Sequence, residues 1–300
     1  MDRPLTEEVS GVNQQCDRRL LAVLAHPDDE SFGPGGTLAL YAMNGVDVHL
    51  ICATSGEAGD VPAELLKNYD DIGKLRIDEL RCAASILGLA DIHLLGYRDS
   101  GMPGSPENQH PEALAAAPLD EVAAMITTLI RQIRPQVVLT FDPQGGYHHP
   151  DHIAIHNATV EAFHAAGDAT RYPDGLPPYH PQKLYFNVIS QRFLRLLVLL
   201  LPLFGHDPRR WGRNADIDLV DITSRSYPIH VRIDFRPVAD IKRKAAACHR
   251  SQGGGSTAGI ITRLRRLTTG HESFMRAHPP APKRLRETDL FEGVQIDLIK

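Results

Sequence analysis

The first half of the chain alternates short apolar runs with longer segments in which apolar residues recur at helical spacing. Short apolar runs bounded by turn residues are typical of buried strands, and recurrence every three to four residues is typical of amphipathic helices. This pattern predicts strands over 20–25, 46–53, 92–95 and 137–141. It predicts helices over 36–43, 71–87, 119–134 and 151–166. Strands separated by helices of this length indicate βαβ units and therefore a parallel sheet.

The second half is less regular, and no domain boundary stands out in it. Its pattern predicts strands over 183–190, 217–222 and 229–234, a helix over 238–250, and a flexible break at SQGGGSTAG (251–259). We therefore expect an N-terminal extension over 1–19 and one α/β domain over 20–300. Within this domain, 20–167 carries the motifs and 168–300 carries C-terminal additions.

Clusters of polar residues come directly after the predicted strands. AHPDDE (25–30) follows the first, TSGEAGD (54–60) the second, GYRDSGM (96–102) the third and FDPQGGYHHPDH (141–152) the fourth. The carboxyl ends of parallel strands share one edge of a sheet, and ligands bind in the crevice there. We therefore expect these four loops to meet in one pocket.

The first and fourth clusters contain the residue types that bind zinc. His26 and Asp29 lie three residues apart on a turn that Pro27 restricts, so both side chains can reach one ion. The fourth cluster offers His148, His149, His152 and His156. A catalytic zinc takes three protein ligands and keeps one position for water, which two histidines and one carboxylate satisfy. The spacing alone leaves open which histidine of the fourth cluster is the ligand.

Asp28 is a candidate general base, because a carboxylate beside the ligands can accept the proton of a metal-activated water. A histidine that is not a ligand can stabilise an oxyanion or protonate the leaving amine. The structural alternatives are that Asp28 or Asp29 caps the following helix and that His26 is an ordinary loop residue.

AHPDDE together with GGYHHPDH resembles the signature pair of the LmbE-like, or PIG-L, zinc-dependent de-N-acetylases. The resemblance covers residues 20–167, with a fainter similarity in KAAACHRSQ (244–252). Members of this family remove acetyl groups from N-acetylglucosamine units, including those of glycosylphosphatidylinositol precursors and of mycothiol and bacillithiol intermediates. The resemblance implies a Rossmann-like, three-layer α/β fold with a mostly parallel sheet, one divalent ion per chain and hydrolysis of an acetamide.

The resemblance also implies roles for particular residues. His26, Asp29 and His152 correspond to the zinc ligands, and Asp28 corresponds to the general base. His149 corresponds to the acid or oxyanion stabiliser, and Asp151 corresponds to the residue that orients the ring of that histidine. Tyr147 corresponds to a tyrosine that helps to polarise the amide carbonyl. One departure is His148, which stands where members of the mycothiol pathway carry Gly or Pro.

Four further residues correspond to positions that line the sugar site: Glu57, Arg76, Arg98 and Asp99. Arg76 matches an arginine that binds substrate in members of the mycothiol pathway. The alternative for Arg76 is an ion pair with a carboxylate on the helix surface.

Charge is distributed unevenly, with 11 basic and 26 acidic residues among the first 182 and 21 and 11 among the rest. The basic C-terminal part suits a solvated face, an anionic substrate or a membrane surface. FLRLLVLLLPLFG (193–205) is apolar, has arginines around it and is too short to span a bilayer. Its candidate roles are a buried helix, a homo-oligomer contact and a peripheral membrane contact.

The compartment follows from the cysteines and the N-terminus. Four cysteines without a CxxC pair give no disulfide framework, and the first residues do not read as a signal peptide. We therefore expect a reducing, cytoplasmic location. If residues 193–205 bind a membrane, we expect the protein to be peripherally associated with it.

The main functional hypothesis is a zinc deacetylase acting on a small N-acetylated sugar, with no nucleic-acid partner. A second is a zinc amidase acting on a larger acyl group or on a thiol conjugate of the mycothiol or bacillithiol type. A third is a non-catalytic, Rossmann-like binding module, although no GxGxxG turn follows the first strand.

Overall fold

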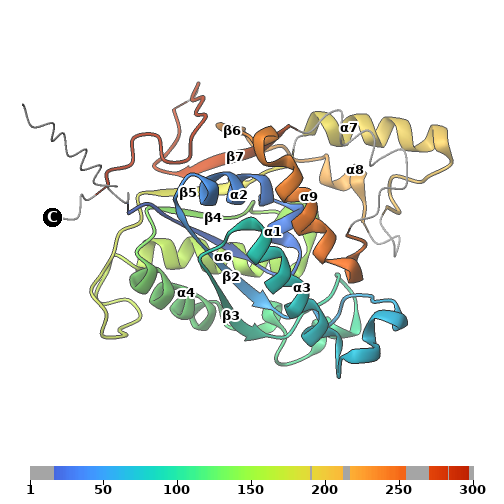
Figure 1. The fold of residues 1–300 in the computed structure, drawn as a ribbon, viewed down its shortest axis with the longest axis horizontal. Helices are drawn as coiled ribbons and strands as arrows, with labels where there is room; N and C mark the ends of the chain where they lie inside the picture. Colours follow the sequence, from blue (N-terminus) through green and yellow to red (C-terminus); the bar gives the residue numbers. More distant parts are fainter. Residues whose placement is uncertain (1–16, 190, 212–216, 255–269, 283, 297–300) are drawn as a thin grey trace, which may run out of the picture.

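A seven-stranded sheet, drawn in Figure 1, runs through the computed structural model, which describes residues 17–189, 191–211, 217–254, 270–282 and 284–296. The strand order is β3-β2-β1-β4-β5-β7-β6. β1 to β5 are parallel, whereas β7 is antiparallel to both of its neighbours. The bounds are β1 Arg19–Leu24, β2 Asp47–Thr54, β3 Asp91–Tyr97, β4 Val137–Phe141, β5 Lys183–Asn187, β6 Val231–Asp234 and β7 His271–His278.

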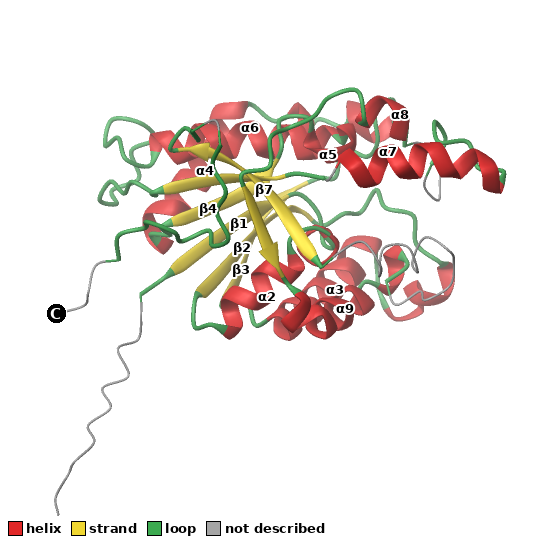
Figure 2. Cartoon of the chain, turned by 90° about the horizontal axis from the view of Figure 1, so that it is seen from above, coloured by secondary structure: helices red, strands yellow, loops and turns green. Residues whose placement is uncertain are grey.

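Helices cover both faces of this sheet, as Figure 2 shows. α4 and α6 lie on one face, and α2, α3 and α9 lie on the other. The bounds of these helices are α2 Gly35–Met43, α3 Ile72–Leu87, α4 Leu119–Ile133, α6 Pro150–Ala165 and α9 Ala239–Cys248. The predicted Rossmann-like, three-layer class with a mostly parallel sheet is confirmed.

Shorter elements connect these layers. The short helices are α1 Asp29–Phe32, α5 Gly145–His148, α7 Gln191–Leu200 and α8 Leu219–Ile222. The 3₁₀ turns are η1 Ala63–Asn68, η2 Pro106–Gln109, η3 Leu114–Ala116, η4 Leu201–Phe204, η5 Arg236–Val238 and η6 Arg250–Gln252.

β1 lies inside the sheet between β2 and β4, and its residues from Leu20 to Leu24 are fully buried. A strand covered by helices on both faces needs apolar residues on both faces, which explains the continuous run at its centre. The strand order reverses its direction between β1 and β4, and a parallel sheet opens a ligand crevice at the carboxyl end of such a pair. The segments that follow β1 and β4 therefore lie together.

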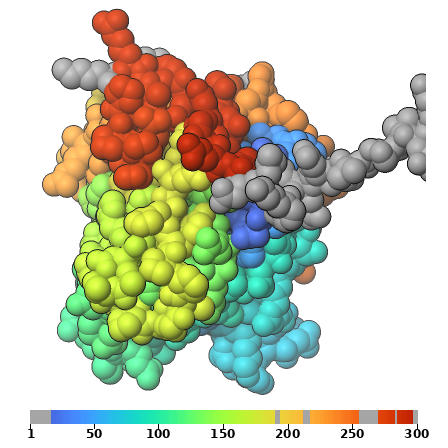
Figure 3. Space-filling view, turned by 90° about the vertical axis from the view of Figure 1, so that its left-hand side faces the viewer, coloured from blue at the N-terminus to red at the C-terminus, as the bar shows by residue number. Residues whose placement is uncertain are grey.

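The face at the amino ends of the strands is closed by polypeptide. Figure 3 shows the segment between α6 and β5 beside the C-terminal segment on this face. Gln182 and Gln295 join the two segments through reciprocal side-chain to backbone hydrogen bonds of 2.6 and 2.8 Å.

The strand predicted over 217–222 is wrong, because this stretch contains the helix α8. The side chain of Asp218 accepts hydrogen bonds from the backbone N–H groups of Val220 and Asp221, which is the geometry of a helix N-cap. Leu219 and Ile222 are then buried on one side. β7 was not predicted, and part of the break predicted over 251–259 lies outside the described residues.

Cys82 of α3 and Cys248 of α9 form a disulfide, with their Cα atoms 5.9 Å apart. We expected no disulfide framework, because the sequence has no CxxC pair. The two cysteines are 166 residues apart, and only the packing of α9 on α3 brings them together. The bond ties the C-terminal half to the half that carries the motifs.

The apolar segment 193–205 lies in α7 and η4, which project from the body of the molecule in Figure 1. One side is buried against α8 and consists of Leu194, Leu197 and Leu201. The other side is exposed and contains Leu196, Leu199, Leu203 and Phe204. Among the described residues, no helix has both the length and the apolar character that crossing a bilayer requires.

Candidate metal centre and catalytic pocket

The turn after β1 places two of the predicted residues at the crevice. Asp28 adopts φ 135° and ψ −26°, a conformation that residues other than glycine rarely adopt, and Asp29 opens α1 immediately after it. The backbone N–H of His26 donates to Oδ2 of Asp29 at 2.8 Å. This local hydrogen bond folds the Asp29 carboxylate back toward the His26 ring.

The turn after β4 leads into α6, whose N-terminus carries the second group of predicted residues. His149 is the N-cap, with its Nδ1 accepting the backbone N–H of Asp151 at 3.2 Å, and Pro150 occupies the first helical position. His152 lies in the same first turn. A Cβ at Gly145, where φ is 65°, would come 2.9 Å from Cβ of His152, so this close approach requires glycine.

The side chains of His26, Asp29 and His152 form a triangle in which each of the two imidazoles faces a different oxygen of the Asp29 carboxylate. Nδ1 of His26 lies 3.2 Å from Nε2 of His152 and 3.5 Å from Oδ2 of Asp29. Nε2 of His152 lies 3.4 Å from Oδ1 of Asp29. Ligands held about 2.1 Å from a tetrahedral zinc ion lie about 3.4 Å from one another. The three residues therefore match the spacing of a zinc-binding triad.

The outer ring nitrogens of His26 and His152, which face away from this triangle, each lie beside an oxygen. Nε2 of His26 lies 3.1 Å from Oδ2 of Asp151 and 3.5 Å from Oδ1 of Asp99. Nδ1 of His152 lies 3.1 Å from the carbonyl oxygen of Gly145. The oxygens beside these outer nitrogens can orient the two rings, as such contacts do for metal-binding histidines.

The structure separates the four histidines that the sequence left open. His149 shares the cluster, because its donor atom and those of His26 and His152 all lie within 4.8 Å of one another. His156 instead directs Nδ1 to the carbonyl oxygen of Phe141 at 2.8 Å. His148 contacts Asp221 of α8 at 3.0 Å.

A second group of donor atoms lies on the other side of the His26 ring, where His26, His149, Asp99 and Asp151 also fall within 4.8 Å of one another. The carboxylate of Asp151 already accepts hydrogen bonds from the backbone N–H and the hydroxyl of Ser100. We therefore assign Asp151 to the support of His26. Its contact with His149 comes from its backbone, whereas the sequence-based expectation was that Asp151 orients that ring.

Asp28 lies beside the triangle with its carboxylate 3.3 Å from Nη2 of Arg76. Burial raises the pKa of Asp28 to about 6, although the Arg76 charge opposes this increase. Burial also raises the pKa of Asp29, but the nearby His152 and His26 outweigh it and hold that pKa well below the usual range. The two neighbouring carboxyl groups thus differ in basicity, as a base and a ligand should.

His149 is neutral in this environment. Burial, together with the charges of His26 and His152, lowers the pKa of His149 to about 2. Because its Nδ1 accepts the Asp151 N–H, the proton of the neutral ring is on Nε2. The ring of Tyr147 packs edge-on against His149 and His152, with centroid distances of 5.9 and 5.0 Å. Both residues line the same cavity as Asp28.

This cavity has a volume of about 440 Å³, and Arg76 and Asp99 also line it. Arg76 is buried, and it donates to the carbonyl oxygens of Gly56 at 2.6 Å and Pro27 at 2.8 Å. It is therefore part of the wall that holds the Asp28 turn, and it is not a surface ion pair.

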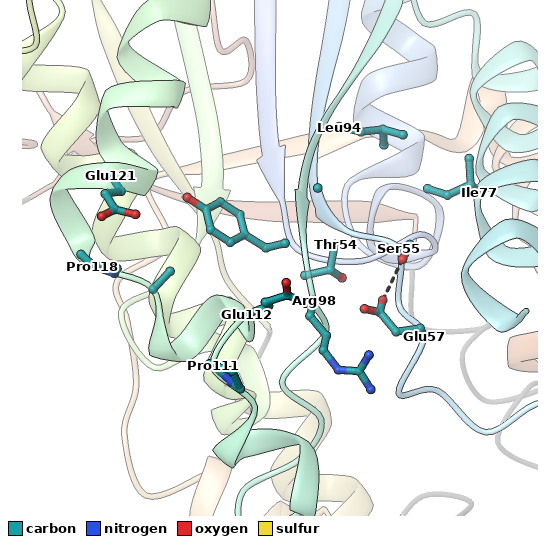
Figure 4. Close-up of a pocket in the computed structure, with 13 residues that line it drawn as sticks. Thr54, Ser55, Glu57, Ile77, Leu94, Arg98, Pro111, Glu112, Pro118 and Glu121 are labelled. Atoms are coloured by element: carbon teal, nitrogen blue, oxygen red, sulfur yellow. Dashed lines mark hydrogen bonds between the residues drawn. The ribbon is translucent and has the colours of Figure 1, made fainter.

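The other two predicted sugar-site residues, Glu57 and Arg98, line a neighbouring cavity of about 480 Å³, shown in Figure 4. Arg98 pairs with Glu107 at 2.6 Å. Glu57 accepts from the Ser55 hydroxyl at 2.7 Å and from the Asp99 backbone N–H at 3.2 Å. Glu57 thus reaches the metal cavity only through the backbone of Asp99.

Sequence reasoning did not select eight of the residues that line the metal cavity, among them Met102, Ile217 and Gln252. Met102 and Gln252 lie inside motifs that resemble the family, so the motifs contained the signal. Ile217 lies in a stretch that the sequence analysis assigned to a strand, and nothing in its pattern pointed to the pocket.

The fold and this cluster define an α/β protein whose histidines and carboxylates could hold a metal ion at the switch point of its sheet. The chain belongs to the PIG-L family, described as GlcNAc-PI de-N-acetylase, whose profile matches residues 21–163. The predicted resemblance is confirmed, and so is the class of enzyme, a deacetylase that hydrolyses an amide bond.

Individual relatives extend this similarity over the whole chain. The 1D-myo-inositol 2-acetamido-2-deoxy-alpha-D-glucopyranoside deacetylase of Streptomyces avermitilis is 39% identical over an alignment of 296 positions, which covers 93% of this chain and 98% of the relative. The N,N'-diacetylchitobiose deacetylase of Pyrococcus horikoshii has a similar fold, with a TM-score of 0.59, 21% identity and coverage of 86% and 83% of the two chains.

The fold is not confined to deacetylases. The 4-carboxy-2-hydroxymuconate hydratase of Pseudomonas putida also matches, with a TM-score of 0.55, 18% identity and coverage of 89% and 99% of the two chains. The reaction must therefore be argued from the residues of the site rather than from the fold.

We expect His152→Gln to abolish tight zinc binding, whereas His156→Gln, one helical turn further along α6, should retain it. Even residues that only support metal ligands change affinity by about 10- to 100-fold, so loss of a ligand should cost more. Metal content after dialysis, measured by plasma mass spectrometry, checks this. Equal zinc content in the two variants would contradict the assignment of His152.

Proposed function

We propose that this protein removes the acetyl group from an N-acetylglucosaminyl inositol glycoside, with zinc bound by His26, Asp29 and His152. The observation that carries the proposal is similarity over nearly the full length to proteins named as 1D-myo-inositol 2-acetamido-2-deoxy-alpha-D-glucopyranoside deacetylases. The spacing of the three side chains, and the oxygens beside the outer ring nitrogens of the two histidines, support the choice of metal. A zinc ion held there would polarise the amide carbonyl and make a water molecule acidic.

Side chains of the protein accept and return the proton of the water and donate hydrogen bonds to the developing oxyanion. Asp28 accepts the proton of the attacking water, and a pKa of about 6 leaves it ionised at neutral pH yet able to pass the proton on. His149 donates its Nε2–H to the oxygen that becomes negative, and the hydroxyl of Tyr147 donates to the same oxygen. The leaving amine then takes its proton from Asp28, so the products are a free amine and acetate.

The sugar is proposed to lie over Asp99 and Arg76, which share the cavity with the catalytic side chains. Asp99 is buried and accepts the backbone N–H of Gly101 at 2.8 Å, which leaves its other oxygen for a sugar hydroxyl. Glu57 supports Asp99 through the backbone, and Arg98 faces the adjoining cavity, where it could bind the remote end of a larger glycoside.

The proposal is tested by measuring amine release from four compounds: the inositol glycoside of N-acetylglucosamine, free N-acetylglucosamine, N,N'-diacetylchitobiose and an N-propionyl analogue of the inositol glycoside. We expect release from the inositol glycoside to exceed the others by at least about tenfold, and a chelator to abolish it. Preference for the propionyl compound would favour the larger-acyl amidase. No release from any compound by zinc-loaded protein would refute the proposed function.

We expect Asp28→Asn to bind zinc like the wild type and to lose about 10²- to 10⁴-fold in kcat. The substitution keeps the size of the side chain and removes its ability to accept a proton, and general base catalysis contributes about this factor. Steady-state kinetics with measured zinc content check it. The assignment of Asp28 is wrong if the variant retains more than a tenth of wild-type kcat.

We further propose that the exposed side of α7 and η4 contacts an anionic membrane surface. Leu199 and Leu203 are 70% and 76% exposed, and Phe204 follows directly. Exposed Arg195 and Arg210 lie on the same projecting unit, so an apolar stripe and basic charges are presented together. This combination is typical of helices that lie in the interface of an anionic bilayer.

Sedimentation with vesicles tests this surface. We expect binding to vesicles containing anionic lipid and not to neutral ones, and loss of binding in Leu199→Ser/Leu203→Ser. Met43→Ser, which changes an exposed apolar residue on α2, should bind like the wild type. If the double variant instead turns a dimer into a monomer in light scattering, the stripe is a contact between copies and the membrane proposal fails.

A further inference from the structure

Asp28 holds its position at an energetic cost. Its φ of 135° makes it one of four described non-glycine residues with positive φ. A backbone in such a region costs on the order of 1–3 kcal/mol and persists only where surrounding contacts impose it. Within Asp28, Arg76 contacts only the carboxylate. Other contacts therefore hold the backbone of Asp28.

The carbonyl oxygen of Asp28 accepts the N–H groups of Ser31 and Phe32 at 3.0 and 2.9 Å. The contact to its own N–H is made by Glu30, two residues further along. The N–H of Asp28 donates to Oε2 of Glu30 at 3.0 Å. Oε1 of Glu30 accepts the Ser31 hydroxyl at 2.5 Å and lies 2.7 Å from Nε2 of His249. Both Glu30 and His249 are completely buried, and neither is among the residues that line the metal cavity. Their effect on the chemistry must therefore pass through Asp28.

His249 is necessary to Glu30 because a buried carboxylate needs compensation. Removing one partner from a buried pair typically costs about 3–5 kcal/mol, since it leaves an uncompensated charge. Burial lowers the pKa of His249, but the Glu30 carboxylate outweighs burial and raises it above its ordinary value. The contact of 2.7 Å between Nε2 of His249 and Oε1 of Glu30 thus gives each of the two buried side chains a polar partner.

The position of His249 is itself fixed by the packing of α9 on α3. His249 follows the last residue of α9, and its neighbour Cys248 is joined to Cys82 of α3. Three residues after Cys248, the N–H and the hydroxyl of Ser251 donate to the Glu79 carboxylate of α3 at 2.8 and 2.5 Å. Figure 1 shows α9 lying across α1 and α3.

We infer that Glu30 and His249 are positioning residues for Asp28, His249 fixing the Glu30 carboxylate and Glu30 fixing the backbone of Asp28 in its left-handed conformation. On this inference the segment 244–252 affects the reaction, even though its residues His249 and Cys248 do not line the cavity. The inference rests on the proposed role of Asp28 as general base.

His249→Ala, His249→Gln and Arg250→Ala test it. Displacement of a catalytic group by about 1 Å can cost about 100-fold, so we expect kcat of His249→Ala to fall 10- to 100-fold with KM and zinc content within twofold. His249→Gln, whose amide can donate to Glu30, should recover kcat to within fivefold of the wild type. Arg250→Ala changes the exposed neighbour and should leave kcat unchanged.

Glu30→Gln completes a double-mutant cycle. If His249 acts through Glu30, the loss of kcat in Glu30→Gln/His249→Ala should be close to the larger single loss rather than the product of both. Independent, multiplicative losses overturn the inference. So does unchanged kcat in His249→Ala, or a loss of kcat that simply follows a loss of zinc.

Two outcomes need separate readouts. Should His249→Ala fail to fold, His249→Asn replaces it. The side chain of Asn is one methylene shorter than that of Gln, so kcat should fall in His249→Asn and recover in His249→Gln.

Should the wild type hydrolyse none of the glycosides, the proposed function fails and crystal structures still decide the inference. Asp28 must then leave positive φ in His249→Ala or His249→Asn and retain it in Arg250→Ala.

Discussion

The burial of several carboxylates beside imidazoles at the end of β1 is the constraint on which the rest of the site depends. Asp99, Asp151 and Glu30 are buried, and Asp28 and Asp29 are 18% and 12% exposed at their side chains. Such a group is tolerated only when it is paired and fully hydrogen-bonded. Each of these carboxylates has a cation, an imidazole or backbone N–H groups within reach. The ligands, the base and their supports therefore have to be assembled together.

This requirement explains why residues from the whole chain meet at a site whose motifs lie in the first half. α3 supplies Arg76 to the carboxylate of Asp28, and the end of α9 supplies His249 to the support of its backbone. The Cys82–Cys248 bond and the Ser251–Glu79 hydrogen bonds hold the two helices together on either side of His249. The C-terminal additions are thus part of the catalytic framework.

The parallel core and the meeting of the first and fourth polar clusters could be predicted from local patterns, whereas the choice of His152 among four histidines came from the resemblance to the family. Buried strands give continuous apolar runs, and His26, Asp29 and His152 lie in motifs that follow such runs. The rest depends on contacts between distant segments. The Cys82–Cys248 bond has no local signal. The 217–222 prediction failed because β-branched residues suggested a strand, whereas the Asp218 cap and packing on α7 produced a short helix.

The fold is similar to that of both a deacetylase and a hydratase, so the sheet alone does not determine the reaction or the substrate. The loops and additions around the sheet must do so. In this chain the α7–α8 unit is such an addition. Its apolar cluster packs against Tyr147, and its Ile217 lines the metal cavity opposite the segment that carries Gln252. His148 joins the same unit to the histidine motif through Asp221. These contacts join one wall of the pocket to α7, the helix whose outer side is exposed.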